Sequence, residues 1–231
     1  MTITLIPVPG LPEVHPGDDL AEMIAGHAPL EDGDVVVVTQ KVVSKAENRL
    51  VEVDPADPLS HKAHVEAEAV RVLRRRGDLV MTETRHGFVC ANAGVDLSNV
   101  ARGWAALLPV DPDRSARWIR DGLRARTGLT LGVIVSDTFG RTWRRGVTDV
   151  AIGTAGIAAI VDLRGTTDAL GRELAVTEVC VADELAAAAE LVMGKASGIP
   201  VALVRGVERQ WLRESSVRAE IVRPPHEDLF R

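Results

Sequence analysis

The sequence contains no tyrosine and few aromatic residues of any kind, which limits both what the chain can bind and how its core is filled. Aromatic residues make up 3% of the 231 residues. Because proteins that bind single-stranded nucleic acid stack the bases on aromatic side chains, this composition disfavours that function. The core must be filled mainly by valine, isoleucine, leucine and alanine, and hydrophobic residues as a whole reach 46%.

Long blocks of positive charge are also missing. The longest run of basic residues is Arg74 to Arg76, and the net charge is -6 with a pI near 5.6. The field of such a chain does not attract a polyanion such as DNA, so we expect no nucleic-acid partner. A small basic pocket for a single anionic ligand remains compatible with this charge.

No apolar run is long enough for a membrane span, since 18 consecutive apolar residues occur nowhere. The first residues, "MTITLIPVPGLPEVHPGDD", lack the basic start and the long apolar stretch of a signal peptide, which predicts a cytoplasmic protein without a membrane partner. Cys90 and Cys180 both lie in apolar runs, and we expect them to serve as small hydrophobic side chains rather than as a disulfide.

Strand-like and helix-like segments are interleaved along the whole chain. There is no internal repeat or low-complexity linker, so we expect a single domain over residues 1–231. Hydrophobic patterns predict strands over 2–8, 35–39, 49–53, 78–84, 88–95, 129–137 and 199–206, and helices over 20–28, 58–77, 112–127 and before Gly194. The fold class predicted is α+β, a mixed α/β unit with parallel and antiparallel strands.

Three acidic residues follow apolar strands: Asp96 in "ANAGVDLSNV", Asp137 in "VIVSDTFGR" and Asp149 in "RRGVTDVAIG". Divalent cations such as Mg²⁺ or Mn²⁺ prefer oxygen ligands, often one or two carboxylates completed by a substrate phosphate. Asp96 and Asp137 together with Thr138 would suit such an ion. The alternative is that each acid only caps a polar turn or a helix.

A second group of residues is cationic and lies in predicted loops after apolar segments. Its members are Lys45, Arg141, Arg144, Arg145 and Lys195. Phosphoryl transfer needs such groups to neutralise phosphate oxygens, but solitary surface cations are common in any protein. The usual nucleotide-binding patterns GxxxxGK[ST] and GxGxxG are missing from the sequence, so the residues alone leave both interpretations open.

Six longer segments together carry more information than any of these single residues. They are "GLPEVHPGDDL", "GDVVVVTQKVVSKAE", "TRHGFVCANAGVDLSNV", "VSDTFGRTWRRGVTDVAIG", "VTEVCVADELAAAAELVMGK" and "IPVALVRG". In this order they resemble the coenzyme F420:L-glutamate ligases, also called F420-0:gamma-glutamyl ligases. The chain is most similar to the N-terminal domain of the actinobacterial two-domain form, and we expect a single-domain, F420 ligase-like fold.

The resemblance implies an enzyme that adds L-glutamate to coenzyme F420-0 and then further γ-linked glutamates. GTP would be the co-substrate, an acyl phosphate the intermediate, and GDP and phosphate the products. Mg²⁺ or Mn²⁺ would serve as cofactor, with room for two sites, and K⁺ is a further candidate; a homodimer is also implied. Two alternatives remain at this stage, a divalent-metal-dependent phosphohydrolase and a non-catalytic nucleotide-binding or deazaflavin-binding protein.

The resemblance also assigns roles to particular residues. It implies Asp137, Lys45 and Arg141 as catalytic residues, with Asp96 and Asp137 as ligands of one cation and Thr138 as a ligand of a second. Residues implied to contact the nucleotide are Leu11, Pro12, Glu13, Val14, Gln40, Lys45, Asn99, Gly194 and Lys195.

Two positions depart from the family pattern. Lys195 stands where archaeal single-domain enzymes have an acid or amide that binds the second metal, and a charged lysine cannot ligate a cation. Either its ammonium replaces that metal electrostatically, or another residue supplies the contact. Gln40 stands where a serine is common, which changes the detail of that nucleotide contact.

Overall fold

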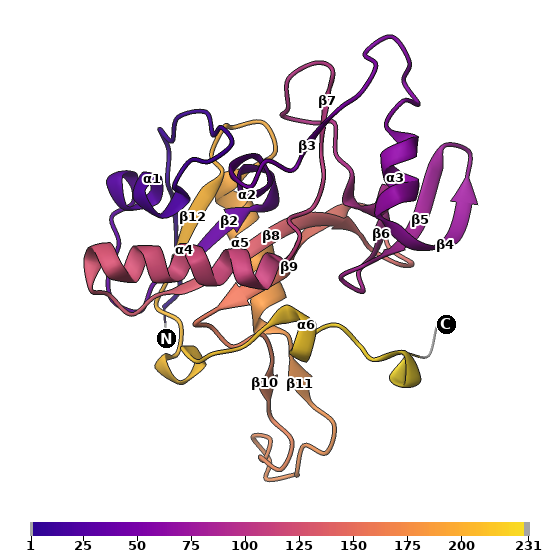
Figure 1. Ribbon diagram of the computed structural model, residues 1–231. Coiled ribbons are helices and arrows are strands. Elements are labelled where there is room, and N and C mark those ends of the chain that lie inside the picture. The colour runs from indigo at the N-terminus through magenta and orange to yellow at the C-terminus, as the bar shows by residue number, and fades with distance from the viewer. Residues whose placement is uncertain (1, 229–231) are drawn as a thin grey trace.

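A five-stranded mixed sheet forms the centre of the computed structural model, which describes residues 2–228 (Figure 1). Its strand order is β1-β12-β2-β8-β9, in which β2 and β8 run parallel and the other neighbours run antiparallel. The strands are β1 (Thr4–Pro7), β2 (Val35–Thr39), β8 (Gly132–Gly140), β9 (Val147–Ala155) and β12 (Val201–Arg205). The α+β class with both kinds of strand pairing is therefore confirmed.

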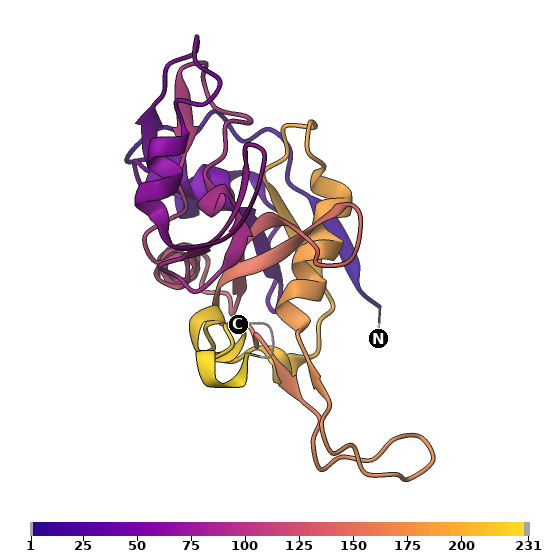
Figure 2. The same ribbon diagram turned by 90° about the vertical axis from the view of Figure 1, so that its right-hand side faces the viewer.

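Helices cover both faces of this sheet, as the two views show (Figures 1 and 2). Val36 and Val38 pack toward the core of α1 (Leu20–His27) and α4 (Pro112–Thr127), whereas the alternate residues Val35 and Val37 pack toward α5 (Val181–Met193). A strand buried on both faces needs a continuous apolar run, which explains "VVVV" in β2.

The helix boundaries follow local capping signals. Asp19 caps α1 by accepting hydrogen bonds from the backbone N–H groups of Ala21 and Glu22. Asp111 caps α4 through the N–H of Arg114, and the helix ends at Gly128, whose φ of 72° is accessible to glycine at little cost. The predicted helices over 20–28 and 112–127 are therefore confirmed within one residue.

A smaller second layer packs beside α2 (Gln40–Ala46). Its elements are β3 (Leu50–Glu52), α3 (Lys62–Glu68), β4 (Ala69–Arg76), β5 (Leu79–Thr84), β6 (Val89–Ala91), the 3-10 helix η1 (Asn92–Gly94) and β7 (Trp104–Ala106). Strand β3 pairs with β7, while β4, β5 and β6 form a separate three-stranded sheet. This layer holds the segment that carries Asp96, whose backbone pairs with Ala106.

The predicted helix over residues 58–77 is wrong. Only α3 is helical there, and the following segment "AVRVLRRR" forms β4, which pairs antiparallel with β5. Hydrogen bonding to β5 outweighs the helical pattern of the charged residues, because a long-range partner strand is available. Gly77, with φ of 57°, belongs to the turn between these strands instead of ending a helix.

The strand predicted over 129–137 is confirmed but extends further, and the alternative of a polar turn at Asp137 is wrong. Strand β8 continues through Asp137 and Thr138 as far as Gly140, because β9 pairs with it along this whole length. Asp149 accordingly lies inside β9 and not in a turn. The two strands therefore place these polar side chains on a rigid element.

The remaining elements lie at the other end of the molecule. They are β10 (Val161–Asp162), β11 (Glu178–Val179), η2 (Arg209–Trp211), α6 (Val217–Glu220) and η3 (Pro225–Glu227). The β10-β11 hairpin projects away from the central sheet (Figure 2). Within residues 2–228, no helix has the length and apolar character needed to cross a membrane. Cys90 and Cys180 are both unpaired, and Cys90 is buried.

Candidate active site

A cavity of about 920 Å³ opens where five segments of the chain meet. The walls come from residues 11–14 before α1, the start of α2, residues 96–101, strand β8, and the end of α5 with the loop that follows it. This volume suits a ligand of nucleotide size. The predicted residues that line it are Leu11, Pro12, Glu13, Val14, Gln40, Lys45, Asp96, Asn99, Asp137, Thr138, Gly194 and Lys195.

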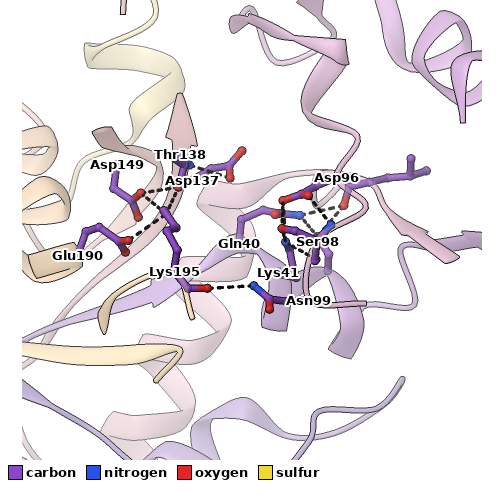
Figure 3. A network of polar contacts seen from close by, with 12 residues as sticks. Gln40, Lys41, Asp96, Ser98, Asn99, Asp137, Thr138, Asp149, Glu190 and Lys195 are labelled. Atoms are coloured by element: carbon purple, nitrogen blue, oxygen red, sulfur yellow. Dashed lines mark hydrogen bonds and ion pairs between the residues drawn. The ribbon is translucent and has the colours of Figure 1, made fainter. Parts of the chain in front are cut away.

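Strand β8 divides the polar side chains of the cavity into two groups (Figure 3). Thr138 lies opposite Asp149 of β9, and Asp137 lies opposite Val150. Because side chains alternate along a strand, Thr138 and Asp149 share the face toward α5, and Asp137 occupies the other face. The register shift between Val135 and Ser136 sets this pairing, since one extra residue of β9 is accommodated there.

On the α5 side, Asp149 is the centre of a hydrogen-bonded cluster (Figure 3). Its carboxylate, 2% exposed, accepts hydrogen bonds from Ser136 Oγ at 3.0 Å and from Thr138 Oγ1 at 2.6 Å. Lys195 Nζ lies 2.9 Å from Asp149 Oδ1 and 3.2 Å from Glu190 Oε1, and it also contacts the hydroxyl of Thr138. Burial would lower the pKa of Lys195, but its bonds to Asp149 and Glu190 outweigh burial and raise that pKa.

On the α2 side, Asp96 forms a second cluster with Lys41. Lys41 Nζ lies 2.6 Å from Asp96 Oδ2 and donates to the backbone oxygen of Ser98 at 2.5 Å and to its hydroxyl at 2.7 Å. The N–H of Ser98 also donates to Asp96 Oδ1 at 2.7 Å. Burial alone would raise the pKa of Asp96, but the bonds from Lys41 and Ser98 outweigh it and lower that pKa below its ordinary value. Asp96 is therefore charged at neutral pH.

Asp137 has no lysine partner of its own within the described chain. The hydrogen bond that its carboxylate accepts comes from the N–H of Thr138 at 2.8 Å. Burial, together with the negative charges of Asp96 and Asp149, raises the pKa of Asp137 from 3.8 to about 7. The charge of Lys41 opposes this shift without cancelling it.

Lys45 and Gln40 project from α2, and both are largely buried. Lys45 Nζ forms an ion pair with Glu13, which belongs to the loop that lines the opposite wall. The amide nitrogen of Gln40 donates to Ser44 Oγ at 2.6 Å and to the backbone oxygen of Leu107 at 3.1 Å. These bonds hold the amide nitrogen of Gln40 in the protein interior, whereas the Lys45 ammonium reaches the cavity wall.

Arg141 is the one predicted site residue that the structure places elsewhere. It lies in the exposed connection between β8 and β9, where its guanidinium donates to the backbone oxygen of Arg145 at 2.8 Å. Arg144 and Arg145 are exposed in the same connection. None of these arginines lines the cavity.

Two charged residues that line the cavity, Lys41 and Glu190, were not predicted from the sequence. Lys41 stands one helical turn before Lys45, and this i, i+4 spacing on one helix face was the available signal. Glu190 gave no such signal, because a single acid near the end of an alanine-rich helix is usually solvated. The sequence identifies Asp149 as an acid near an apolar strand, but its position beside Lys195 depends on the pairing of Asp149 with Thr138 between β8 and β9.

The oxygen donors that line the cavity limit which divalent cation sites it can form. Within residues 2–228, no group of three or more His, Cys, Asp or Glu side chains is arranged to hold a metal ion. Asp96 and Asp137 nevertheless fit one cation whose remaining ligands are water and phosphate, as Mg²⁺ prefers, because no ammonium of the described residues contacts the carboxylate of Asp137 and Lys41 contacts Oδ2 of Asp96 and not Oδ1. Thr138 does not fit a second cation, since its hydroxyl already contacts Lys195 and Asp149.

Comparison with known proteins identifies the family. A profile of the F420-0:gamma-glutamyl ligases matches residues 10–206. This chain belongs to that family. Proteins named coenzyme F420:L-glutamate ligase are 44% identical in Methanopyrus kandleri, over 100% of this chain and 98% of the relative, and 43% identical in Methanothermobacter thermautotrophicus, over the full length of both. A relative of the same name from Archaeoglobus fulgidus is 41% identical over 100% of this chain and 97% of its own length.

Proposed function

We propose that this protein is a GTP-dependent ligase that joins L-glutamate to coenzyme F420-0. Family membership and the names of the full-length relatives support a ligase acting on this coenzyme with glutamate. GTP dependence, the cation requirement and the later addition of γ-linked glutamates are parts of the proposal. The observation that carries it is the single cavity that gathers Lys41, Lys45 and Lys195 around Asp96 and Asp137.

The chemistry explains why such a cavity is needed. A carboxylate cannot expel oxide, so its oxygen must first attack the γ-phosphorus of GTP while the bond to the β-phosphate oxygen breaks and GDP leaves. The α-amino nitrogen of glutamate then attacks the carbonyl carbon of this acyl phosphate, inorganic phosphate leaves, and the nitrogen loses a proton to solvent. Two accessible steps replace one inaccessible step.

In this proposal the lysines of the cavity contact phosphate oxygens, and the aspartates bind a divalent cation. Lys45 and Lys195 neutralise phosphate oxygens and so reduce their repulsion of the incoming carboxylate. Asp96 and Asp137 would hold a Mg²⁺ or Mn²⁺ ion, which when bound orients and neutralises the γ-phosphate. Residues 11–14 and Asn99 would hold the rest of the nucleotide, and Asn99 is itself positioned by its bond to the backbone oxygen of Lys195. K⁺ would be a further counter-ion.

Arg141 takes a different role in this proposal, because it lies outside the cavity. Together with Arg144 and Arg145 it forms an exposed cationic connection beyond the polar part of β8. Such a group can contact only the part of the anionic acceptor that projects from the cavity. We assign it to binding of the acceptor and not to the bond-making steps.

A homodimer is the proposed assembly. The projecting β10-β11 hairpin exposes Leu170 and Val176, which are 95% and 84% exposed, and a second copy could cover them. Light scattering at micromolar concentration should give twice the chain mass. A mass near 24.8 kDa would contradict the proposal.

Mass spectrometry provides the direct test of function. The purified protein is incubated with F420-0, L-glutamate, GTP and Mg²⁺, and each component is omitted in turn. A product heavier by one or more glutamyl residues, dependent on all four components, is the expected result. Phosphate release without this product would indicate a phosphohydrolase, and nucleotide binding without any reaction would indicate a binding protein; either result would overturn the proposal.

A further inference from the structure

Lys195 occupies a position that is built for a cation. It follows Gly194, which ends α5, and its side chain turns back toward β8 and β9. Three oxygen atoms from three different elements surround its Nζ atom: Thr138 Oγ1 in β8, Asp149 Oδ1 in β9 and Glu190 Oε1 in α5. An ammonium group carries three N–H donors, and this set offers one acceptor to each of them.

The charges around Lys195 require a positive partner. Asp149 is 2% exposed, and its donors among residues 2–228 are Lys195 and the neutral hydroxyl groups of Ser136 and Thr138. Glu190 adds a second carboxylate that is 20% exposed. An ionised carboxylate as deeply buried as Asp149 is stable only when a cation compensates it.

A metal ion cannot share this position with the ammonium. A bound Mg²⁺ would lie about 2.1 Å from its oxygen ligands, and Lys195 Nζ is itself only 2.9 Å from Asp149 Oδ1. Two positive charges would then compete for the same oxygen at a separation where they repel strongly. The position therefore holds either the ammonium or a metal ion.

We propose that the ammonium of Lys195 permanently takes the place of a second cation in this active site. The cavity then recruits at most one divalent ion, at Asp96 and Asp137, and supplies its other positive charge covalently. This inference deepens the proposed function and rests on it only for the role of that charge toward phosphate. Lys195 is suited to this role because it lines the cavity and its side chain is 54% exposed.

Binding of Mn²⁺ alone tests the proposal without any turnover. Free Mn²⁺ is measured by electron paramagnetic resonance during titration of the full chain and of the Lys195→Ala variant. If the ammonium occupies a cation position, its removal frees Thr138, Asp149 and Glu190, and the variant binds about one more Mn²⁺ per chain than the wild type. Lys195→Glu adds a carboxylate and should bind this extra ion at least tenfold more tightly.

Two controls separate a specific site from a change of net charge. Arg172→Ala removes one positive charge from the exposed loop of the β10-β11 hairpin and should leave the number of bound ions unchanged. The double variant Lys195→Ala/Asp149→Asn removes the buried carboxylate and should lose the additional ion. Circular dichroism confirms the fold of each variant, and Lys195→Gln, which keeps much of the side-chain volume, replaces Lys195→Ala if the latter does not fold.

The number of Mn²⁺ ions bound per chain can either support the proposal about Lys195 or overturn it. A gain of about one ion in the Lys195 variants, reversed by Asp149→Asn, supports the proposal. An equal count in the wild type and in both Lys195 variants overturns it, as does a wild-type chain that already binds two ions. The result is independent of the proposed function, because failure of glutamate ligation would leave the difference in Mn²⁺ binding unchanged.

Discussion

The two walls of the cavity contain the same kind of ion pair in opposite orientations. On the α5 wall the carboxylate of Asp149 is 2% exposed and the ammonium of Lys195 is 54% exposed. On the α2 wall the ammonium of Lys41 is 11% exposed and the carboxylate of Asp96 is 38% exposed. In each pair the buried partner holds the other side chain in place, and the more exposed partner is the charged group that a ligand in the cavity can approach.

The group nearest the cavity on the α5 side is therefore an ammonium, flanked by the carboxylates of Asp149 and Glu190, whereas on the α2 side it is the carboxylate of Asp96. The exposed ammonium of the α5 wall suits phosphate oxygens, whereas the carboxylates of Asp96 and Asp137, which both line the cavity, suit a divalent cation. A metal-nucleotide complex has the same polarity, with a cation at one side of its phosphates. The following predictions test whether the two walls have these distinct roles.

The largest effect is expected for Asp137→Asn, which removes the charge that has no lysine partner. Turnover should fall on the order of 10³-fold, because the cavity loses the Asp137 carboxylate that would bind the divalent cation. Several kcal/mol of transition-state stabilisation are lost with it. Product formation measured by mass spectrometry provides the readout. Asp162→Asn, on the distant hairpin, is the matched control and should keep normal turnover.

Retention of most activity by Asp137→Asn would contradict the assignment of the cation to the α2 wall. Far-ultraviolet circular dichroism and the unfolding transition must match those of the wild type for this comparison to hold. The asparagine keeps the shape of the side chain and can still accept the hydrogen bond from the N–H of Thr138.

Lys195 should contribute more to stability than Lys41, although Lys195 is the more exposed of the two lysines. Lys195→Met leaves the deeply buried Asp149 without a cation, and we expect the free energy of unfolding to fall by about 3 kcal/mol. Lys41→Met leaves Asp96, which water can reach, and should cost about 1 kcal/mol. Urea denaturation in metal-free buffer measures both values, and a larger loss for Lys41→Met would refute the proposed difference between the walls.

The pH dependence of stability gives a third test. The folded protein raises the pKa of Asp137 from 3.8 to about 7, so between these values it binds a proton that the unfolded chain has released. The free energy of unfolding should therefore fall as pH rises from about 4 to about 7 in the metal-free protein. Asp137→Asn lacks this contribution, and the difference between the two stability curves isolates it from the titration of other groups.

Absence of any pH-dependent difference between the wild type and Asp137→Asn would show that Asp137 is not held in the buried, negatively charged environment described above. Addition of Mn²⁺ should also reduce the difference, because a bound cation favours the ionised carboxylate. Thermal unfolding at several pH values, with and without Mn²⁺, measures both effects.

The smallest effect is expected for Arg141→Ala, since this residue lies outside both walls. The KM for F420-0 should rise by up to about tenfold with kcat unchanged, as expected for a contact made equally in the ground state and the transition state. Steady-state kinetics at varied F420-0 concentration measure this. A large loss of kcat would indicate that the β8-β9 connection approaches the reacting groups.

Much of the fold follows from local patterns in the sequence. The run "VVVV" predicts a continuous buried strand, and Asp18 or Asp19, Asp111 and Gly128 predict where helices begin and end, with Asp19 the cap of α1 in the structure. These signals succeed because capping and burial depend on neighbouring residues and on hydrophobic period. The helix predicted over 58–77 failed because strand β4 depends on pairing with β5, which local propensity does not describe.

The sequence predicts most of the residues that line the candidate site, but not how these residues are arranged in space. The resemblance to the ligase family names twelve residues that line one cavity, but the sequence alone does not show that the predicted strand continues through Thr138, or which face of the sheet Asp137 and Thr138 each occupy. That arrangement depends on the register between β8 and β9, including the shift after Val135.

The charged groups, the core-forming strands and the membership of the family can all be read from the order of the amino acids. Which member of each ion pair is buried, and that Lys41 pairs with Asp96 and Lys195 with Asp149, follow from the folded arrangement alone. The physical reason is that desolvation and Coulomb interaction depend on distances between residues far apart in the chain, 55 positions for Lys41 and Asp96 and 46 for Lys195 and Asp149.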